Sequence, residues 1–578
     1  MRRLRVGLAQ INTTVGDLEG NVQKVLEYVD RARELRVDLV SFPELTVTGY
    51  PPEDLLLRPS FVRENLDALQ AVVRGCGGIT AVVGFVDLDN GEIYNAAAVI
   101  HDVRLAGVYH KRFLPNYGVF DEFRYFSAGA ESPVYTVAGT GVGVSICEDI
   151  WYPGNPTRAQ AFAGAQVIVN INGSPYHAGK RRFREQMLTT RASDYGVFIC
   201  YINQVGGQDE LVFDGASMAL NAAGEIVARA AMFEEELLVC DLNVEEVLRM
   251  HLHDPRRRQE RTAHALAKEV RLLHLSGLPF SADKAPLEPR LAPALEPEAE
   301  VYAALVTSTR DYLRKTGFTK AVIALSGGID SSLVLAIAVD ALGKENVTGV
   351  SMPSRYSSEG SIKDAQEVAD NMGIELMIVP IEPAHAAYLE MLEQHFAGSE
   401  PEVAEENIQS RIRGNIIMAL SNKFGWLVLT TGNKSEMATG YATLYGDMAG
   451  GFAVIKDVPK TLVYRLARYR NTWSRRPVIP ESVLTKPPSA ELKPGQLDQD
   501  TLPPYEVVDP ILEAYVEQDR SVEEIVAMGY DYTTVVRVVQ MVNRNEYKRR
   551  QAPPGVKITP RAFGRDRRLP IANRYRGF

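Results

Sequence analysis

A stretch near the middle of the chain, ALSGGIDSS from Ala324 to Ser332, constrains the fold more than any other part of the sequence. It overlaps a short apolar run, Ala321 to Leu325, and leads into SLVLAIAVDAL, whose apolar spacing predicts a buried or amphipathic helix. The segment is therefore expected to form a strand, a Gly-Ser turn and a helix. Adjacent glycines let backbone N–H groups approach a ligand closely, serine hydroxyls add donors, and a helix N-terminus favours an anion. This combination predicts a phosphate-binding loop.

The loop is not of the Walker A type, because its spacing differs and the lysine that would contact the β- and γ-phosphates is missing. The pattern S-G-G-x-D-S resembles the pyrophosphate-binding loop of the ATP pyrophosphatases. These enzymes hold the β- and γ-phosphates as a leaving group and pass AMP to a carboxyl or carbonyl oxygen. The alternative is an ordinary Gly-rich turn between a strand and a helix.

The composition bounds the class of protein. A chain of 578 residues exceeds what one hydrophobic core usually supports, so two or three domains are expected. With 73 acidic and 63 basic residues the net charge is −10, which argues against general binding to nucleic acid or to anionic membranes. There is no long apolar run and no signal peptide, so a cytoplasmic protein is expected. The four cysteines are widely spaced and suggest neither a disulfide framework nor a zinc site.

The N-terminal half has the pattern of an α/β domain. RVGLAQ (5–10) reads as a strand, residues 21–38 have the apolar spacing of a helix, and LVSFPEL (39–45) reads as a second strand. We expect this alternation of strand and helix to continue, with strands buried on both faces. The later strands are expected in ITAVVGFV, NAAAVIH, GVGVSIC, AQVIVNINGS and GVFICYINQVG.

Three residues at or near strand ends in this half could be chemical groups or ordinary ones. Glu44 in FPEL is either a helix cap or a carboxylate aimed into a site at the sheet edge. Lys111 in YHKRFLPN is either a solvated loop residue or a cation held for catalysis. Cys147, at the end of GVGVSIC, is either a small core residue or a nucleophile.

Taken together, the three residues indicate a catalytic triad. A thiol at a strand end needs a base to take its proton and a cation to stabilise the oxyanion, and Glu44 and Lys111 supply these roles. Their settings, FPE, HKRFLPN and C-E-D, resemble those of the nitrilase superfamily over roughly residues 1–275. The resemblance implies a four-layer αββα sandwich in which Cys147 attacks an amide carbon. The oxyanion would also meet the backbone N–H of Glu148.

The nature of the amide is suggested by a narrower resemblance, to the glutaminase domains of glutamine-dependent NAD synthetases. It implies that Tyr117, Ser174 and Lys180 bind glutamine, with Lys180 suited to the α-carboxylate. Each residue has an ordinary alternative: a packed ring, a turn residue before Pro175, and part of a basic surface run.

The pattern changes from about Asp254, with DPRRRQERT and later a Pro-rich, acidic run at 281–300. This second run predicts a semi-rigid, exposed linker. We therefore predict a nitrilase-like glutaminase domain at 1–275, a linker at 276–298 and a second domain at 299–578.

The C-terminal half predicts a parallel sheet. Strands are expected in VTGVSMP (347–353) and ELMIVPIE (375–382), and WLVLTTGNKSE (426–436) repeats the strand, turn and helix of the phosphate loop. Turns of this kind lie at the carboxyl edge of one sheet, where open α/β folds bind ligands. Thr431 and Glu436 would then share a crevice with the loop.

Two further segments of this half bear on substrate binding. Asn407, Arg411 and Asn415 fall at i, i+4 and i+8 of a predicted helix, where they form either a dinucleotide-binding stripe or a solvated face. The run PPSAELKPGQLDQDTLPPYEVVD is rich in Pro, Gly and acids and is expected to be a mobile lid.

The order ENIQ-R-RG, TTGNKSE, GD…K-D-PKT and PSAEL…LPPY resembles the NAD synthetases, and with the nitrilase half it resembles the glutamine-dependent NAD synthetases along nearly the whole chain. The resemblance implies a Rossmann-like, doubly wound sheet of the ATP pyrophosphatase type in the second domain and a homo-oligomer. It implies ATP contacts from the phosphate loop and Thr431, Mg²⁺ held by Asp330 and Glu436, and contacts to deamido-NAD from Asn407, Glu436 and Lys548. The implied loop contacts are Leu325, Ser326, Gly327, Gly328, Ile329, Asp330, Ser331 and Ser332.

These expectations combine into one reaction. ATP would adenylate the nicotinate carboxylate of deamido-NAD with release of pyrophosphate, and ammonia from glutamine would displace AMP to give NAD. An alternative within the enzymes is another glutamine-dependent synthetase that amidates a different carboxylate. Two others are a non-catalytic descendant of such enzymes and an amidase whose second half only binds nucleotide.

Overall fold

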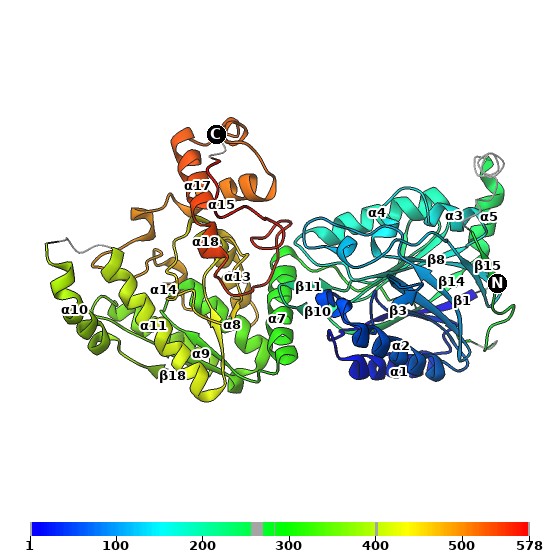
Figure 1. Ribbon diagram of the computed structural model, residues 1–578, viewed down its shortest axis with the longest axis horizontal. Coiled ribbons are helices and arrows are strands. Elements are labelled where there is room, and N and C mark those ends of the chain that lie inside the picture. Colours follow the sequence, from blue (N-terminus) through cyan, green and yellow to red (C-terminus); the bar gives the residue numbers. More distant parts are fainter. Residues whose placement is uncertain (1–2, 256–269, 282–283, 289, 399–402, 576–578) are drawn as a thin grey trace. The chain divides into compact units, whose positions relative to one another are not determined.

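The computed structural model describes residues 3–255, 270–281, 284–288, 290–398 and 403–575 (Figure 1). The chain divides into two compact units. The first comprises Met1–Gln208 and Val212–Leu295, and the second comprises Glu296–Phe578 together with Asp209–Leu211.

The first unit is built on two sheets. In the described part of the chain, six strands form a sheet with the order β14-β1-β2-β3-β4-β5, and seven form a sheet with the order β13-β12-β9-β8-β7-β6-β15. The first sheet contains β1 (Arg3–Gln10), β2 (Leu39–Ser41), β3 (Thr80–Asp89), β4 (Glu92–His101), β5 (Arg104–His110) and β14 (Glu236–Asn243). The second contains β6 (Val134–Val137), β7 (Thr140–Ile146), β8 (Val167–Asn172), β9 (Phe198–Asn203), β12 (Met218–Leu220), β13 (Ile226–Arg229) and β15 (Leu272–His274). The remaining elements are the hairpin β10 (Val205–Gln208) and β11 (Leu211–Asp214) and the helices α1 (Leu18–Glu34), α2 (Pro59–Gly75), α3 (Thr157–Phe162), α4 (Lys180–Tyr195) and α5 (Glu245–His253).

The two sheets pack face to face, with helices on their outer faces. Alternate residues of one strand point to opposite sides of its sheet, and β3 shows this clearly. Val82 joins the core between the sheets, whereas Ala81 and Val83 join the core beneath α1 and α2. On the other side, Leu188 of α4 packs against Ile199 of the second sheet. Figure 1 shows the resulting layers, helix, sheet, sheet and helix, and they confirm the predicted αββα sandwich.

The expected regular alternation of strand and helix was wrong between residues 80 and 110. There β3, β4 and β5 form an antiparallel meander, whereas β1–β2–β3, β7–β8–β9 and the pair β6–β15 run parallel. The turn between β3 and β4 is Asn90-Gly91, with φ of 50° and 85°. Asn-Gly favours a two-residue hairpin because both residues tolerate positive φ, so the hairpin has a local cause in the sequence.

The second unit contains a parallel sheet with the order β18-β17-β16-β19-β20. Its strands are β16 (Ala321–Ala324), β17 (Val347–Ser351), β18 (Glu375–Ile378), β19 (Leu427–Thr430) and β20 (Phe452–Ala453). This order reverses direction at β16, which confirms the predicted Rossmann-like, doubly wound sheet and places a ligand-binding crevice beside β16 and β19.

Helices cover the sheet and extend beyond it. The core on one face joins Val322 of β16 and Val350 of β17 to Ile412 and Ile417 of α11. The helices are α7 (Pro297–Thr316), α8 (Ile329–Leu342), α9 (Glu359–Met372), α10 (Glu382–Phe396), α11 (Val403–Phe424), α12 (Lys434–Thr439), α13 (Lys460–Asn471), α14 (Glu481–Thr485), α15 (Tyr505–Leu512), α16 (Val522–Ala527), α17 (Tyr532–Arg544) and α18 (Glu546–Arg549). No helix among them, or elsewhere in the described residues, is long and apolar enough to cross a membrane.

The predicted linker at 276–298 is mostly exposed where it is described, and it runs along the first unit and contacts it. Arg229 donates its N–H to the carbonyl of Arg290, and Ala292 donates its N–H back to the carbonyl of Arg229. Lys284 forms an ion pair with Asp38. The basic run at 256–261 and residues 282–283 and 289 lie outside the described residues. The boundaries 1–275, 276–298 and 299–578 stay a prediction.

Candidate active sites

Cys147 occupies a strained position at the end of β7. Its φ is 42°, a left-handed conformation that a residue with a side chain rarely adopts, and its side chain is buried. The neighbouring Asp149 fixes this turn. One carboxylate oxygen accepts the N–H of Ile146 at 3.0 Å, and the other accepts those of Arg112 at 3.1 Å and Phe113 at 3.0 Å. Asp149 therefore ties the turn of Cys147 to the segment that follows Lys111.

Lys111 and Glu44 lie in direct contact, both fully buried. Lys111 Nζ donates to Glu44 Oε1 at 2.7 Å. The same oxygen accepts from Asn95 Nδ2 at 2.7 Å, and Glu44 Oε2 accepts the backbone N–H of Gly173 at 2.8 Å. Both oxygens of Glu44 are thus held, and the carboxylate cannot rotate freely.

A second glutamate, Glu122, shares the lysine. Lys111 Nζ donates to Glu122 Oε1 at 2.7 Å, and Tyr50 donates its hydroxyl to the same oxygen at 3.2 Å. Burial raises the pKa of Glu122 to about 7, with Lys111 opposing the rise and Glu44 adding to it. Glu122 can therefore lose or gain a proton near neutrality. Sequence reasoning missed it.

Electrostatics keep the thiol protonated and the lysine charged. Burial raises the pKa of Cys147 well above its ordinary value, Glu44 raises it further, and Lys111 acts in the opposite direction. For Lys111, burial lowers the pKa, but the carboxylates of Glu122 and Glu44 outweigh it and leave the pKa raised. A protonated thiol needs a base at the moment of attack, and a carboxylate is in place close by.

The three residues expected to bind glutamine lie around Cys147. Tyr117 is exposed, and its hydroxyl donates to Glu148 Oε2 at 2.9 Å. Ser174 is buried in the segment after β8, which is a parallel neighbour of β7. Lys180 begins α4 and donates from Nζ to the carbonyl of Pro175 at 2.6 Å. Ser174 and Lys180 thus follow the strand next to β7, and Tyr117 contacts Glu148, the residue after Cys147.

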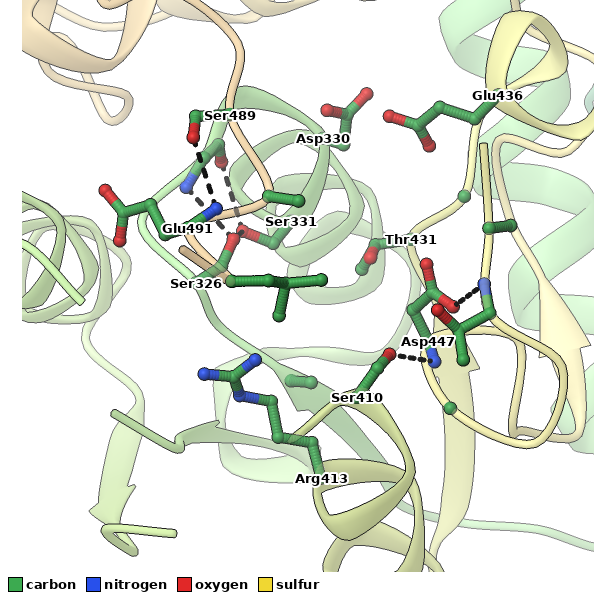
Figure 2. Close-up of a pocket in the computed structure, with 18 of the residues that line it drawn as sticks. Ser326, Asp330, Ser331, Ser410, Arg413, Thr431, Glu436, Asp447, Ser489 and Glu491 are labelled. Carbon is green, nitrogen blue, oxygen red and sulfur yellow. Dashed lines mark hydrogen bonds between the residues drawn. The ribbon is translucent and has the colours of Figure 1, made fainter. Parts of the chain in front are cut away.

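The second unit contains a cavity of about 520 Å³ at the carboxyl ends of β16, β17 and β19 (Figure 2). Six residues of the predicted phosphate loop line it, and so do Thr431, Glu436, Asn407 and Lys548. The six are Leu325, Ser326, Gly328, Ile329, Asp330 and Ser331, whereas Gly327 and Ser332 are not among the lining residues.

The loop itself is shaped by Gly327, whose φ is 79°. A Cβ at this position would lie 2.1 Å from the carbonyl oxygen of Ser361, so only glycine fits. The hydroxyls of Ser331 and Ser332 donate to the carbonyl of Gly328 at 3.1 and 2.8 Å. α8 begins at Ile329, earlier than the expected start, and so Asp330 lies in its first turn.

The two carboxylates expected to bind Mg²⁺ are both present at the cavity, and Figure 2 shows Asp330 and Glu436 facing one another. Lys460 forms ion pairs with Asp330 and, at 3.6 Å, with Glu436. Burial raises the pKa of Glu436 to about 8, and the charge of Asp330 adds to the rise against the opposing effect of Lys460. Carboxylate oxygens such as these are the kind of ligand that Mg²⁺ prefers. They fit such an ion as two of its ligands, although no group of three or more ligating side chains occurs among the described residues.

The predicted stripe on α11 was wrong in part. Asn407 lines the main cavity, but Arg411 and Asn415 line a separate cavity of about 430 Å³ with Met418, Tyr445 and Gln551. With about 3.6 residues per turn, each step of four residues advances about 40° around the helix, so the stripe drifts away from the site. Arg413 takes the place of Arg411 and reaches into the main cavity (Figure 2).

Lys548, in the short helix α18, also lines the cavity. Its Nζ donates to the carbonyls of Gly440 at 2.7 Å and Ala442 at 2.8 Å, and burial lowers its pKa against the opposing charge of Asp447. From the sequence alone, Lys548 could equally have been an ordinary surface residue. The predicted lid also lines the cavity, through Pro487 to Lys493, Gln496, Asp498 and Thr501.

Two family models match the chain: carbon-nitrogen hydrolase over residues 5–251 and NAD synthase over residues 301–552. A glutamine-dependent NAD(+) synthetase of Thermotoga maritima is 54% identical over 100% of both chains, and that of Aquifex aeolicus is 50% identical over 99% of this chain and 100% of its own. The chain belongs to the glutamine-dependent NAD(+) synthetases. A solved member of this family, from Acinetobacter baumannii in complex with adenosine diphosphate, is 43% identical, with a TM-score of 0.75 and 99% of each chain covered.

Within this family framework, the structure adds cavity residues that the motifs did not single out. Lys460 lies in the sequence IKDVPK beside Lys456, and only the contact with Asp330 identifies it as the site lysine. Lys434, inside the TTGNKSE motif, points elsewhere: it pairs with Glu517 at 2.7 Å and Asp457 at 2.9 Å. Similarly, Asp121 and Glu122 are adjacent, and the spacing gave no reason to choose Glu122.

Proposed function

We propose that this chain converts deamido-NAD to NAD, using ATP to activate the nicotinate carboxylate and glutamine as the source of ammonia. The observation that carries the proposal is the buried contact of Lys111 with Glu44 and Glu122 beside Cys147, in a chain that matches the glutamine-dependent NAD(+) synthetases over its full length. The proposed roles of individual residues follow from the chemistry of each site.

In the first unit, Cys147 Sγ attacks the side-chain amide carbon of glutamine as Glu44 takes the thiol proton. Lys111 and the backbone N–H of Glu148 stabilise the oxyanion of the tetrahedral intermediate. Glu44 returns the proton to the departing nitrogen, which leaves as ammonia, and a thioester remains. Water then attacks the thioester with Glu44 as base, giving glutamate and the free thiol.

Other residues bind the parts of glutamine that do not react. Lys180 suits its α-carboxylate, and Ser174 and Tyr117 complete the binding site. Because Tyr117 is exposed while Cys147 is buried, the side chain of glutamine would enter with its amide first.

In the second unit, an oxygen of the nicotinate carboxylate attacks the α-phosphorus of ATP, and pyrophosphate leaves from the loop Ser326–Ser332. Thr431 and the loop hold ATP, and Asn407, Glu436 and Lys548 hold deamido-NAD. Mg²⁺, when bound, neutralises phosphate charge, and Asp330 and Glu436 would hold it. Ammonia then attacks the acyl carbon of the adenylate, and AMP departs.

The domain limits 1–275 and 299–578, a homo-oligomeric state and a cytoplasmic location belong to this proposal. A second candidate, amidation of a different carboxylate by the same chemistry, is kept because the ATP pyrophosphatase loop itself does not select the acceptor.

A substrate panel tests the proposal. The full chain is assayed with ATP, Mg²⁺ and glutamine against deamido-NAD, xanthylate and aspartate. We expect amide formation with deamido-NAD alone, with AMP and pyrophosphate formed in equal amounts. Turnover of xanthylate or aspartate, or ADP as the product, would contradict it.

A further inference from the structure

A buried polar network lies behind the segment that carries Gly173, Ser174 and Lys180. Asn203 ends β9, beside Asn172 at the end of β8. Its Oδ1 accepts the backbone N–H of Ser174 at 2.9 Å, and its Nδ2 lies 3.3 Å from the carbonyl oxygen of Ser174. One side chain therefore holds both backbone polar groups of the residue expected to bind glutamine.

Asn203 is itself held by an ion pair. Its Nδ2 also lies 3.3 Å from Asp214 Oδ1, at the end of β11. Arg184 of α4 donates to both oxygens of Asp214, at 3.1 and 3.2 Å. All three side chains are completely buried.

The same network fixes the start of α4. Arg184 lies one turn after Lys180, so the two residues share a face of the helix. Tyr176, between Ser174 and Lys180, donates its N–H to the carbonyl of Val212 in β11 at 2.7 Å. Residues 173–180 are thus held at both ends and in the middle.

The segment also touches the base. The N–H of Gly173 donates to Glu44 Oε2 at 2.8 Å, next to the residue that Asn203 clamps. A Cβ at Gly173 would lie 2.9 Å from the ring of Tyr50, so the backbone here packs tightly against the site. A shift of Ser174 would therefore move a hydrogen bond to Glu44.

Stability alone is a weak reason for such a network. A buried ion pair gains little over well-packed apolar residues, because removing two charges from water offsets their attraction. A buried amide held to a two-point ion pair does, however, specify one geometry.

We propose that Asn203, held by the Asp214–Arg184 ion pair, is a positioning residue for glutamine hydrolysis: it fixes residues 173–180 and so orients Ser174, Lys180 and Glu44. This rests on the proposed function, since it assigns those three residues to glutamine binding and proton transfer. Asn203 touches no reacting atom.

The test compares the full-length wild type with Asn203→Ala, which removes the clamp and leaves Asp214 paired with Arg184. NAD formation is measured with glutamine and, separately, with ammonium chloride. We expect the KM for glutamine to rise at least about tenfold with a smaller fall in kcat, because Ser174 and Lys180 act in binding and the loss of binding contacts raises KM. The ammonium-supported rate should stay within about twofold of the wild type, because it does not use this site.

Two further variants keep the test decisive. Arg184→Lys keeps a cation beside Asp214 but loses the two-point contact, so the KM should rise in the same direction by less. Asn170→Ala is the matched control: Asn170 is a buried asparagine of β8 whose Nδ2 donates to Ser145 at 3.0 Å, and its loss should leave the KM unchanged.

The positioning role is overturned if Asn203→Ala keeps the wild-type KM, if Asn170→Ala raises the KM equally, or if the ammonium-supported rate falls in step. If Asn203→Ala does not fold, an unchanged KM in Arg184→Lys overturns it. Failure of the proposed function is distinguishable, because the wild type would then form no NAD from deamido-NAD with either nitrogen source.

Discussion

Lys111 donates a hydrogen bond of 2.7 Å to Glu122, a carboxyl group that lies 11 residues further along the chain in a separate turn. This places a second glutamate, with a pKa raised by burial to about 7, on the same ammonium group that contacts Glu44. The charge on the lysine is therefore balanced by two carboxyl groups, one of which titrates in the physiological range.

Glu122 should control the acid side of the pH profile of glutamine hydrolysis. As the pH falls through about 7, Glu122 gains a proton and Lys111 loses an anionic partner, so we expect kcat/KM for glutamine to fall. Glu122→Gln should lower kcat/KM at least about tenfold, an effect of the size known for acid–base groups, and should abolish the fall of kcat/KM at low pH. The profile with ammonium, measured on the same preparations, should not change.

The same group has a consequence for stability. The pKa of Glu122 is raised from its ordinary 4.5, so its contribution is fully present below about pH 4.5 and is lost as the pH rises through 7. Glu122→Gln removes this dependence, and its Tm relative to the wild type should rise between pH 5 and 8. A Tm difference that is flat across this range would contradict the assignment.

Cys147→Ala should separate the two reactions. With ATP and deamido-NAD, the glutamine-supported formation of NAD should disappear, whereas the ammonium-supported rate should remain. The reason is that the thiol is needed only to release ammonia. Loss of both reactions, or of neither, would refute this division of labour.

Gly327→Ala should damage the phosphate loop specifically. The new Cβ would lie 2.1 Å from Ser361 O, and a φ of 79° disfavours any side chain, so we expect a cost of about 1–3 kcal/mol and a large rise in the KM for ATP with ammonium as the nitrogen source. Gly360→Ala is the control, because the nearest atom to its Cβ is 3.9 Å away. Equal effects in the two variants would count against the steric account.

Glu436→Gln should weaken the response to Mg²⁺. Removing one of two carboxylates at the cavity should raise the Mg²⁺ concentration for half-maximal ammonium-supported activity at least about tenfold, since ligand charge sets the affinity of such sites. Glu506→Gln, at an exposed carboxylate of α15, should behave as the wild type. Direct Mg²⁺ titration of both proteins by calorimetry gives a readout that is independent of turnover.

The sequence predicted those features that are encoded by residues close together in the chain. Glu44, Lys111 and Cys147 each follow or end an apolar strand, and their complementary roles and nitrilase-like motifs indicated one site, although the three strands belong to two different sheets. The phosphate loop was recognisable for the same reason, since its strand, turn and helix are contiguous in the chain.

The features that were missed depend on contacts between distant segments. Asp121 and Glu122 are adjacent acidic residues, and only the contact with Lys111 identifies Glu122 as the site residue. In the same way, only the contact with Asp330 distinguishes Lys460 from Lys456. The predicted stripe of Asn407, Arg411 and Asn415 does not face one cavity, because a spacing of four residues exceeds the helical repeat of about 3.6 residues and turns away from it. The hairpin at Asn90-Gly91 was misread although its turn signal was present.

The burial of Cys147 has a consequence for the chemical durability of this chain. A thiol that is only 2% exposed and kept protonated by its surroundings reacts slowly with general alkylating agents and peroxides, since these require an accessible thiolate. An electrophile shaped like glutamine would be drawn to the same sulfur. The fold therefore protects its nucleophile from adventitious oxidation while leaving it open to selective covalent inhibitors.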